Sequence, residues 1–148
     1  MAYPDVDDEA ALRALSARYA SAADRRDVAA FLTIFDEEAR LRVFDPSSSA
    51  TPRTDRRGRD ALAAIPKALE RYASTFHLVG NALYDVTGDE ATGEVYCLAH
   101  HLSAEHTDHV MLIRYGDRYR KVEGRWLIVD RRVQVDWRET RPTVRPAE

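Results

Sequence analysis

The sequence predicts a single α+β domain in which helices come first and a long antiparallel sheet follows. Helical periodicity dominates the first half of the chain, while apolar and polar residues alternate over residues 76–137, with glycine-containing turn signals between the alternating stretches. Helices segregated from strands in this way are typical of α+β proteins. The 148 residues are enough for one domain with its own core, which we assign to residues 1–148.

Three helices are expected, over residues 7–24, about 27–36 and 59–73. In the first, Leu12, Leu15 and Tyr19 recur at helical spacing, and an aspartate at its start can cap it. The alternating segment Arg40–Phe44 is expected to form a short strand between the second and third helices.

Four long strands are expected after the helices, at Phe76–Thr87, Glu90–Ser103, His109–Val122 and Arg125–Trp137. An acidic residue beside a glycine separates two pairs of them, at Gly88-Asp89 and Glu123-Gly124, which is a hairpin signal. The segment Pro46–Arg57 combines serine, threonine, proline and arginine without an apolar anchor. We expect this segment to be a mobile loop that covers the mouth of a pocket.

Alternation along the strands predicts which side chains share a face of the sheet. One set is Val95, Cys97, Ala99 and His101, and a second set is Trp126, Ile128, Asp130 and Arg132. The opposite faces of both strands are also partly apolar. Because an exposed apolar sheet face is a liability, we expect a homodimer formed through the outer surface of the sheet.

The bulk composition excludes several kinds of partner. A net charge of −3 with arginines interleaved among acids gives no basic stripe for nucleic acid. No stretch approaches the roughly 20 apolar residues that a membrane helix needs, and the first twenty residues lack the apolar run of a secretory signal. Cys97 is the only cysteine, so no intrachain disulfide can form, and we expect a cytoplasmic location.

Three residues predict an acid–base site that needs no metal or cofactor. Asp24 ends the first helix, and His77 and His101 lie in two predicted strands. Imidazole pKa values near neutrality suit proton transfer, and a carboxylate can orient one ring. The alternatives are a solvated aspartate at a helix end and a histidine satisfied within the core. The other histidines of this region have no paired cysteines and only a weak zinc-like spacing, so we expect no metal.

Several motifs together resemble the SnoaL-like branch of the NTF2-like superfamily. They span about residues 7–135, which we take as the core of the domain, and comprise Tyr19 to Asp27 (YASAADRRD), Phe31 and Phe35, Gly58–Leu62 (GRDAL), Phe76–Asn81 (FHLVGN), Tyr96–His101 (YCLAHH) and Gly124–Arg132 (GRWLIVDRR). The resemblance implies a cone-shaped α+β barrel, with three helices packed on a curved, mostly antiparallel sheet.

Within that superfamily the chain most resembles the scytalone dehydratase and bile-acid dehydratase branch. The first of these enzymes pairs a helix-end aspartate with two strand histidines, which implies catalytic roles for Asp24, His77 and His101. The second has a tyrosine five residues before its aspartate, which implies a role for Tyr19. On an ideal wheel Tyr19 and Asp24 lie about 140° apart, so they share a pocket only if the helix bends or ends near Ala23. The expected contacts to substrate are Phe35, Phe44, Cys97, Trp126 and Arg132; Arg132 has the alternative of a surface ion pair.

The predicted function is a cofactor-independent enzyme that acts on a small hydrophobic oxygenated molecule such as a polyketide, terpenoid or steroid. Elimination of water is the first choice, because it needs one group to take the α-proton and one to protonate the leaving hydroxyl. An isomerase or cyclase that uses the same residues is the second. A non-catalytic ligand-binding module on the same fold is the third alternative, and epoxide hydrolysis through Asp130 and Arg132 ranks behind it.

Overall fold

The computed structural model describes residues 6–144 of the 148. The elements in chain order are α1 (Val6–Arg25), α2 (Val28–Thr33), β1 (Phe35–Phe44), β2 (Thr54–Arg57), α3 (Arg59–Leu62), α4 (Ala64–Ala68), the 3₁₀ turn η1 (Leu69–Arg71), β3 (Ser74–Thr87), β4 (Glu90–Leu102), β5 (Thr107–Val122) and β6 (Arg125–Pro142). The α+β class and the helices-first order are confirmed.

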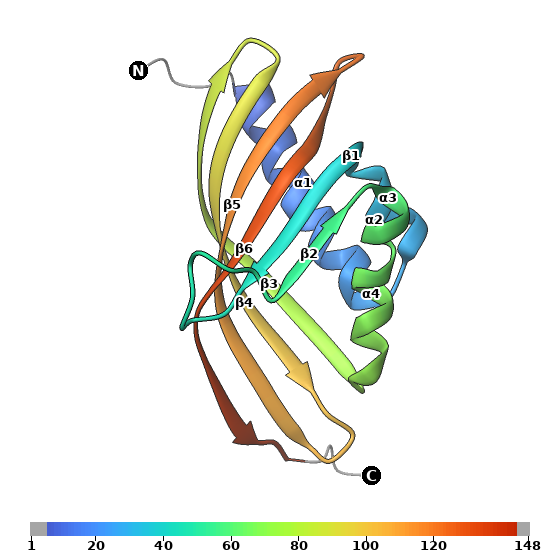
Figure 1. The fold of residues 1–148 in the computed structure, drawn as a ribbon, viewed down its shortest axis with the longest axis vertical. Coiled ribbons are helices and arrows are strands. Elements are labelled where there is room, and N and C mark those ends of the chain that lie inside the picture. The colour runs from blue at the N-terminus through green and yellow to red at the C-terminus, as the bar shows by residue number, and fades with distance from the viewer. Residues whose placement is uncertain (1–5, 145–148) are drawn as a thin grey trace.

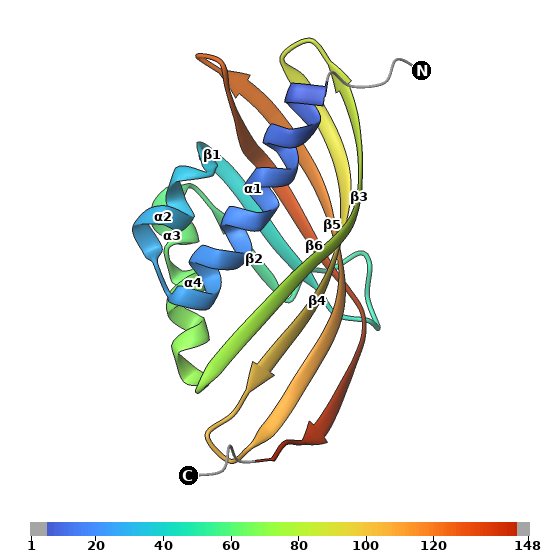
Figure 2. The same cartoon turned by 180° about the vertical axis from the view of Figure 1, so that it is seen from behind.

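A single six-stranded sheet forms the body of the molecule, with strand order β2-β1-β6-β5-β4-β3. Every pairing is antiparallel except that of β1 with β6. The sheet is strongly curved and open, and the helices all lie against its concave side (Figure 1). Helix α1 crosses that concave side and runs beside β3, as the reverse view also shows (Figure 2). The expected fold of helices on a curved, mostly antiparallel sheet is therefore confirmed.

The main core lies between α1 and the concave face of the sheet. Helix α1 contributes Leu12, Leu15 and Tyr19 at the predicted helical spacing, and all three are buried. Strand β4 contributes the predicted set of alternating side chains, and each of them is at most 5% exposed: Val95, Cys97, Ala99 and His101. His100 points to the other face, so the choice between the two neighbouring histidines is confirmed.

The two expected hairpin turns are present, and their backbones explain their sequences. Glu123 and Gly124 join β5 to β6 with φ values of 50° and 76°. Two successive positive φ angles are the signature of a type I′ turn, whose twist matches that of the strands. Gly88, with a φ of 60°, supplies the positive angle of the β3–β4 turn. These turns set the register of the hairpins that carry the histidines.

A bulge in β6 overturns the predicted face of Arg132. Tyr119 pairs with Ile128, but the preceding residue on β5, Arg118, pairs with Asp130, so Val129 is an extra residue on β6. An extra residue inverts the alternation beyond it. Trp126 and Ile128 therefore face the core together with Arg131 and Val133, while Arg132 faces outward. The expectation that Arg132 shares a face with Trp126 is wrong for this reason.

Several predicted boundaries are also wrong. The second helix ends at Thr33 rather than near residue 36, because the Ile34 carbonyl accepts a hydrogen bond from the Ile128 backbone of β6 and Phe35 already pairs with that strand. The third helix is broken into α3, α4 and η1; Pro66 lacks the N–H that a continuous helix would need there. Strand β6 extends to Pro142, beyond the expected end at Trp137.

The segment Pro46–Arg57 lies partly against the outer face of the sheet and partly at the rim of a depression on the concave side. Its last four residues form β2 on the edge of β1. The Ser49 carbonyl accepts a 2.6 Å hydrogen bond from Arg132, which ties the preceding loop to the outer face of the sheet. Arg53 lines that depression, which is described below, and closure of the segment over the site stays a prediction. The mobility of this segment stays a prediction.

The outer face of the sheet is apolar, as the alternation predicts. Phe76, Leu78, Tyr96 and Trp137 are 61%, 54%, 43% and 56% exposed. Trp137 lines a groove across β4, β5 and β6 together with Leu98 and Leu112. Among the described helices, none is long and apolar enough to span a membrane. The cytoplasmic location stays a prediction.

Candidate active site

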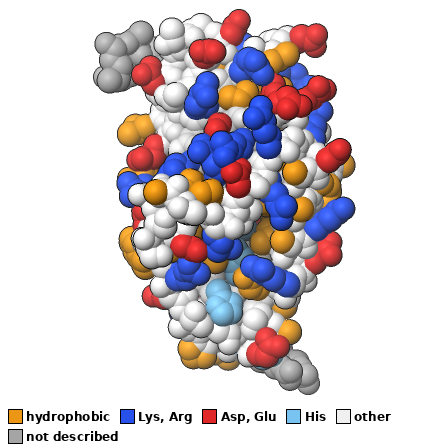
Figure 3. All heavy atoms as spheres, in the orientation of Figure 1, with side chains coloured by type: hydrophobic (Ala, Val, Ile, Leu, Met, Phe, Trp, Pro, Cys, Tyr) orange, Lys and Arg blue, Asp and Glu red, His pale blue; other side chains and the backbone are white. Residues whose placement is uncertain are grey.

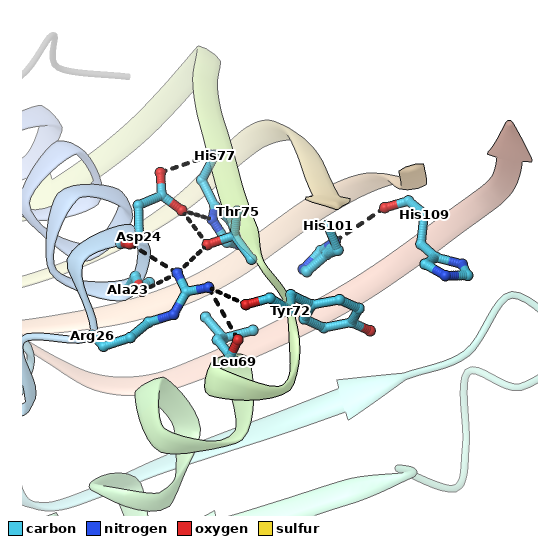
Figure 4. Close-up of polar contacts among 9 residues, drawn as sticks. All are labelled: Ala23, Asp24, Arg26, Leu69, Tyr72, Thr75, His77, His101 and His109. Carbon is cyan, nitrogen blue, oxygen red and sulfur yellow. Dashed lines mark hydrogen bonds and ion pairs between the residues drawn. The ribbon is translucent and has the colours of Figure 1, made fainter. Parts of the chain in front are cut away.

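The site begins at the C-terminal end of α1, where Arg26 reverses the chain. Its φ of 57° is left-handed, a conformation that non-glycine residues rarely adopt. The Arg26 guanidinium donates to the backbone carbonyls of Ala23, Asp24, Leu69 and Tyr72 and to the Thr75 hydroxyl, at 2.6–3.4 Å. These five bonds stabilise the strained turn and join the helix end to η1 and β3 (Figure 4). Asp24 is thereby held facing β3.

Asp24 and His77 form a closely coupled pair (Figure 4). The His77 ring nitrogen Nδ1 lies 2.7 Å from Asp24 Oδ1, and the His77 backbone N–H donates to Oδ2 at 3.0 Å. The Thr75 hydroxyl donates to Oδ1 at 2.8 Å. The side chains of His77 and Asp24 are 7% and 22% exposed, so the pair is largely shielded from water but remains accessible from one side.

The protonation of this pair follows from its contacts. Burial alone would raise the pKa of the Asp24 carboxyl, but hydrogen bonds from the His77 ring, the His77 backbone and Thr75 outweigh burial and lower that pKa below its ordinary value. An ionised Asp24 requires a proton on His77 Nδ1. The neutral His77 ring then carries its lone pair on Nε2, where it can accept a proton from a bound molecule.

His101 lies beside His77 on the same face of the sheet. The ring centroids are 5.5 Å apart and nearly perpendicular. His101 Nδ1 donates to the His109 carbonyl at 3.1 Å, because a carbonyl oxygen can only accept (Figure 4). Burial, and then the neighbouring His77, lower the pKa of His101 to about 4. At neutral pH His101 is therefore uncharged and also presents Nε2 as an acceptor.

Tyr19 belongs to a separate buried cluster around Arg131. Its ring packs on Phe31, Phe35 and Tyr115, with centroids 5.1, 6.3 and 5.5 Å away, and the Arg131 guanidinium lies 4.3 Å from the Tyr19 ring centroid. Burial raises the pKa of Tyr19 to about 12, although the charge of Arg131 opposes this. Among the described residues, no hydrogen bond joins Tyr19 to Asp24, His77 or His101. Helix α1 continues to Arg25. It does not end near Ala23, which was the condition under which Tyr19 and Asp24 could face the same pocket.

Arg131 and Asp117 form a fully buried ion pair. Arg131 Nε and Nη2 donate to the two Asp117 carboxylate oxygens at 2.9 and 2.6 Å, and both side chains are 0% exposed. Tyr119 donates its hydroxyl to Asp117 at 2.7 Å, and Ser16 accepts from Arg131 at 3.2 Å. Burial would lower the pKa of Arg131, but the adjacent Asp117 carboxylate raises it above its ordinary value. Arg131 therefore stays charged inside the core.

The residues predicted to contact substrate divide into two groups. Cys97 and Phe35 lie in the core cluster on the concave side. Burial raises the pKa of the Cys97 thiol to about 11. The thiol is therefore uncharged at neutral pH and packs in the core rather than acting as a nucleophile. Phe44 and Arg132 lie on the outer side, where the Arg132 guanidinium covers the Phe44 ring at 3.5 Å. They do not reach Asp24 or His77.

Trp126 is also remote from the histidines. Its indole N–H donates to Asp8 at the opposite end of α1 from Asp24, at 2.8 Å. Asp8 and Asp24 are about 24 Å apart along the helix axis, because each residue adds roughly 1.5 Å. The expectation that Trp126 lines the same pocket as His77 is therefore wrong. No group of three or more His, Cys, Asp and Glu side chains in residues 6–144 is arranged to hold a metal ion.

Comparison with known proteins assigns the family. Residues 4–132 match the model of the SnoaL-like domain. The chain belongs to the SnoaL-like domain family. A search of curated proteins gives no match.

Solved structures share the fold over almost the whole chain. A protein of unknown function with a cystatin-like fold from Nostoc punctiforme is 25% identical, with 91% of this chain and 96% of that one covered and a TM-score of 0.76. A protein from Novosphingobium aromaticivorans that is provisionally assigned as a scytalone dehydratase is 21% identical, with 97% of both chains covered and a TM-score of 0.79. The hexachlorocyclohexane dehydrochlorinase LinA-type3 from Novosphingobium barchaimii is 15% identical, with 96% and 97% covered and a TM-score of 0.81. At these identities the last two show the fold alone.

Sequence reasoning missed three residues that build this region. Arg26 and Thr75 fix Asp24 from outside the predicted triad. Tyr72 packs on His101 with ring centroids 5.0 Å apart. Arg131 of the separate core cluster was also missed: unbroken alternation would place it on the face opposite Trp126, and the bulge that turns it inward has no signature in an alternating run. Thr75 lies two residues before His77 and therefore on the same face of the strand, separated from it by Phe76. This spacing could have indicated a hydroxyl near Asp24, once the end of the helix had been placed beside that strand.

Proposed function

We propose that this SnoaL-like protein is a cofactor-independent acid–base enzyme that removes a proton next to a carbonyl and expels water from a small hydrophobic substrate. The coupling of Asp24 to His77 Nδ1 carries this proposal, because it leaves a basic Nε2 on a shielded and oriented ring. Membership in the SnoaL-like family supports small-molecule chemistry but does not select the reaction.

In the proposed reaction His77 performs both proton transfers. Nε2 accepts the α-proton as the C–H electron pair moves toward the carbonyl, and the ionised Asp24 stabilises the imidazolium that forms. The same imidazolium then protonates the β-hydroxyl as the C–O bond breaks, which releases water and regenerates neutral His77. One residue acting as base and then acid implies elimination on one face of the substrate.

His101 is proposed to position the substrate rather than to act as an acid. Its pKa of about 4 keeps it neutral, so it has no proton to give from Nε2 at pH 7. That nitrogen can accept a hydrogen bond from the departing hydroxyl group, which would hold the hydroxyl beside His77. Tyr19, for which the resemblance implied a catalytic role, has no hydrogen bond to Asp24, His77 or His101, in the part of the chain that the structure describes, that would support one.

The reaction can be tested with 3-hydroxy-1-tetralone, a β-hydroxy ketone that gives fluorescent 1-naphthol on loss of water. Asp24→Asn and His77→Ala should each lower the rate by about 10²–10⁴, the usual contribution of a positioned proton-transfer group. Asp85→Asn, which removes an exposed carboxylate of β3, serves as the matched control and should leave the rate unchanged. Equal rates for the wild type and both site variants would refute the proposal.

Two alternatives give different results in the same experiment run in D₂O. An isomerase on the same residues would exchange the α-proton or move a double bond without releasing water. A binding module would bind the ketone, with shifts in the His77 and His101 ring signals, but would produce neither exchange nor product. Either result would replace the dehydratase assignment.

We also propose that the apolar outer face of the sheet is covered by a second copy of the chain. The exposed side chains of Phe76, Leu78, Tyr96 and Trp137 form one surface on β3, β4 and β6, which a partner sheet would remove from water. Light scattering at micromolar concentration should give the mass of a dimer, and Trp137→Lys should shift it toward the monomer. A monomeric wild type would refute this proposal.

A further inference from the structure

We propose that the mouth of the site binds a carboxylate, so that the substrate is a hydrophobic acid. This inference rests on the proposed function and narrows its substrate class. A depression of about 180 Å³ opens beside His101. Three arginines from three different segments line it: Arg53 of the loop before β2, Arg71 of η1 and Arg138 of β6.

One aromatic ring, that of Tyr72, lies between the depression and the histidine pair. Tyr72 lines the depression and packs on His101 and His109, with ring centroids 5.0 and 6.2 Å away. His101 in turn contacts His77. Figure 3 shows histidine rings at the bottom of a hollow, with basic side chains on both sides of it. A molecule that reaches His77 from this opening would therefore extend past Tyr72 into the arginine-lined mouth.

Arg71 is the arginine best placed to hold an anion. Its guanidinium lies 4.9 Å from the centre of the Tyr72 ring and donates to the Tyr72 hydroxyl at 3.2 Å. Over the described part of the chain, no carboxylate lies within ion-pair distance of Arg71. Its charge is close enough to His101 to help lower the pKa of that ring, after burial and His77. The stacking on Tyr72 pre-orients the planar guanidinium for a two-point contact with a carboxylate.

The charge balance of the mouth fits a monoanion. Arg53 and Arg138 share a single carboxylate, Asp45, at 3.0 and 2.6 Å. Glu139 is the other acid at the rim of the depression. It lies 3.8 Å from Arg141, which does not line the depression. Three guanidinium groups thus face two carboxylates and retain one positive charge. A carboxylate neutralises that charge, whereas a doubly charged phosphate would leave an excess negative charge beside Asp45 and Glu139.

Binding of 2-naphthoate and of its neutral isostere 2-naphthamide tests this directly by calorimetry. The naphthoate should bind about tenfold more tightly, the typical gain from one charge-assisted contact at a partly exposed site. Arg71→Gln should abolish the preference for the acid. Arg125→Gln, an exposed arginine at the start of β6, is the matched control and should retain it.

The same measurement on Asp24→Asn separates this proposal from the proposed reaction. That variant lacks the carboxylate that pairs with the proposed base, His77, but keeps all three mouth arginines. A persisting preference for naphthoate therefore supports the carboxylate site even if no elimination is ever observed. Equal affinity for acid and amide, no binding of either, or an undiminished preference in Arg71→Gln would overturn the inference. Tighter binding of 2-naphthyl phosphate than of naphthoate would instead assign the mouth to a phosphate.

Discussion

Mild acid should destabilise this protein through His101. The pKa of the folded-state ring is lowered to about 4 by burial and by His77, whereas the unfolded chain has the ordinary value of 6.5. Between these values the unfolded state binds more protons, so the free energy of unfolding falls as the pH falls through this window. From pH 7 to pH 5 the difference amounts to about 2 kcal/mol for this one group.

Urea unfolding at pH 7 and pH 5 measures this contribution, with His101→Asn as the comparison. Asparagine keeps an N–H donor for the His109 carbonyl but cannot titrate, so the variant should lose about 2 kcal/mol less stability than the wild type over the same interval. Asp24 does not contribute over this pH interval. Because its pKa is lowered in the folded state, the stability that depends on its ionised form is lost only below about the ordinary pKa of 3.8. An equal loss in both proteins would refute the assignment of a buried neutral imidazole.

Two further predictions concern the core. Arg131→Met should lower the free energy of unfolding by about 3–5 kcal/mol because it leaves the buried carboxylate of Asp117 unpaired, and the double variant with Asp117→Leu should recover part of that loss, as chemical denaturation will show. Gly93→Ala should cost about 1–3 kcal/mol because the new Cβ would lie 2.7 Å from a Tyr84 ring carbon; Gly116→Ala, whose Cβ would meet nothing closer than 3.8 Å, should be nearly neutral in the same measurement.

The sequence was sufficient for the features that depend on local periodicity. The four long strands, the turns at Gly88 and Glu123, and the inward face of β4 all follow from alternation and turn chemistry. The contact of Asp24 with His77 also agrees with the expectation, because helix α1 ends where its pattern ends. Their catalytic roles stay predictions.

The remaining errors come from interactions that a local pattern cannot encode. The extra Val129 moves Arg131 inside and Arg132 outside, and nothing in that apolar stretch distinguishes a bulged strand from a regular one. Arg26 occupies a left-handed backbone position that is usually taken by glycine. The sequence could not indicate this, because acceptors that stabilise the Arg26 side chain there belong to η1 and β3, far along the chain. Trp126 was misplaced because sharing a concave face does not imply lying at the same height along α1.

The Arg26 guanidinium also determines how a ligand can enter. It fastens the end of α1 to the residues in and after η1 and to the start of β3, so these segments can separate only if its hydrogen bonds to Leu69, Tyr72 and Thr75 break. By contrast, the β4–β5 hairpin and the lower ends of β5 and β6 extend past the helices (Figures 1 and 2). We therefore expect the helical side to stay rigid and the β4–β5 hairpin to move when a ligand enters. Amide hydrogen exchange should then be slow around Arg26 and faster near His106.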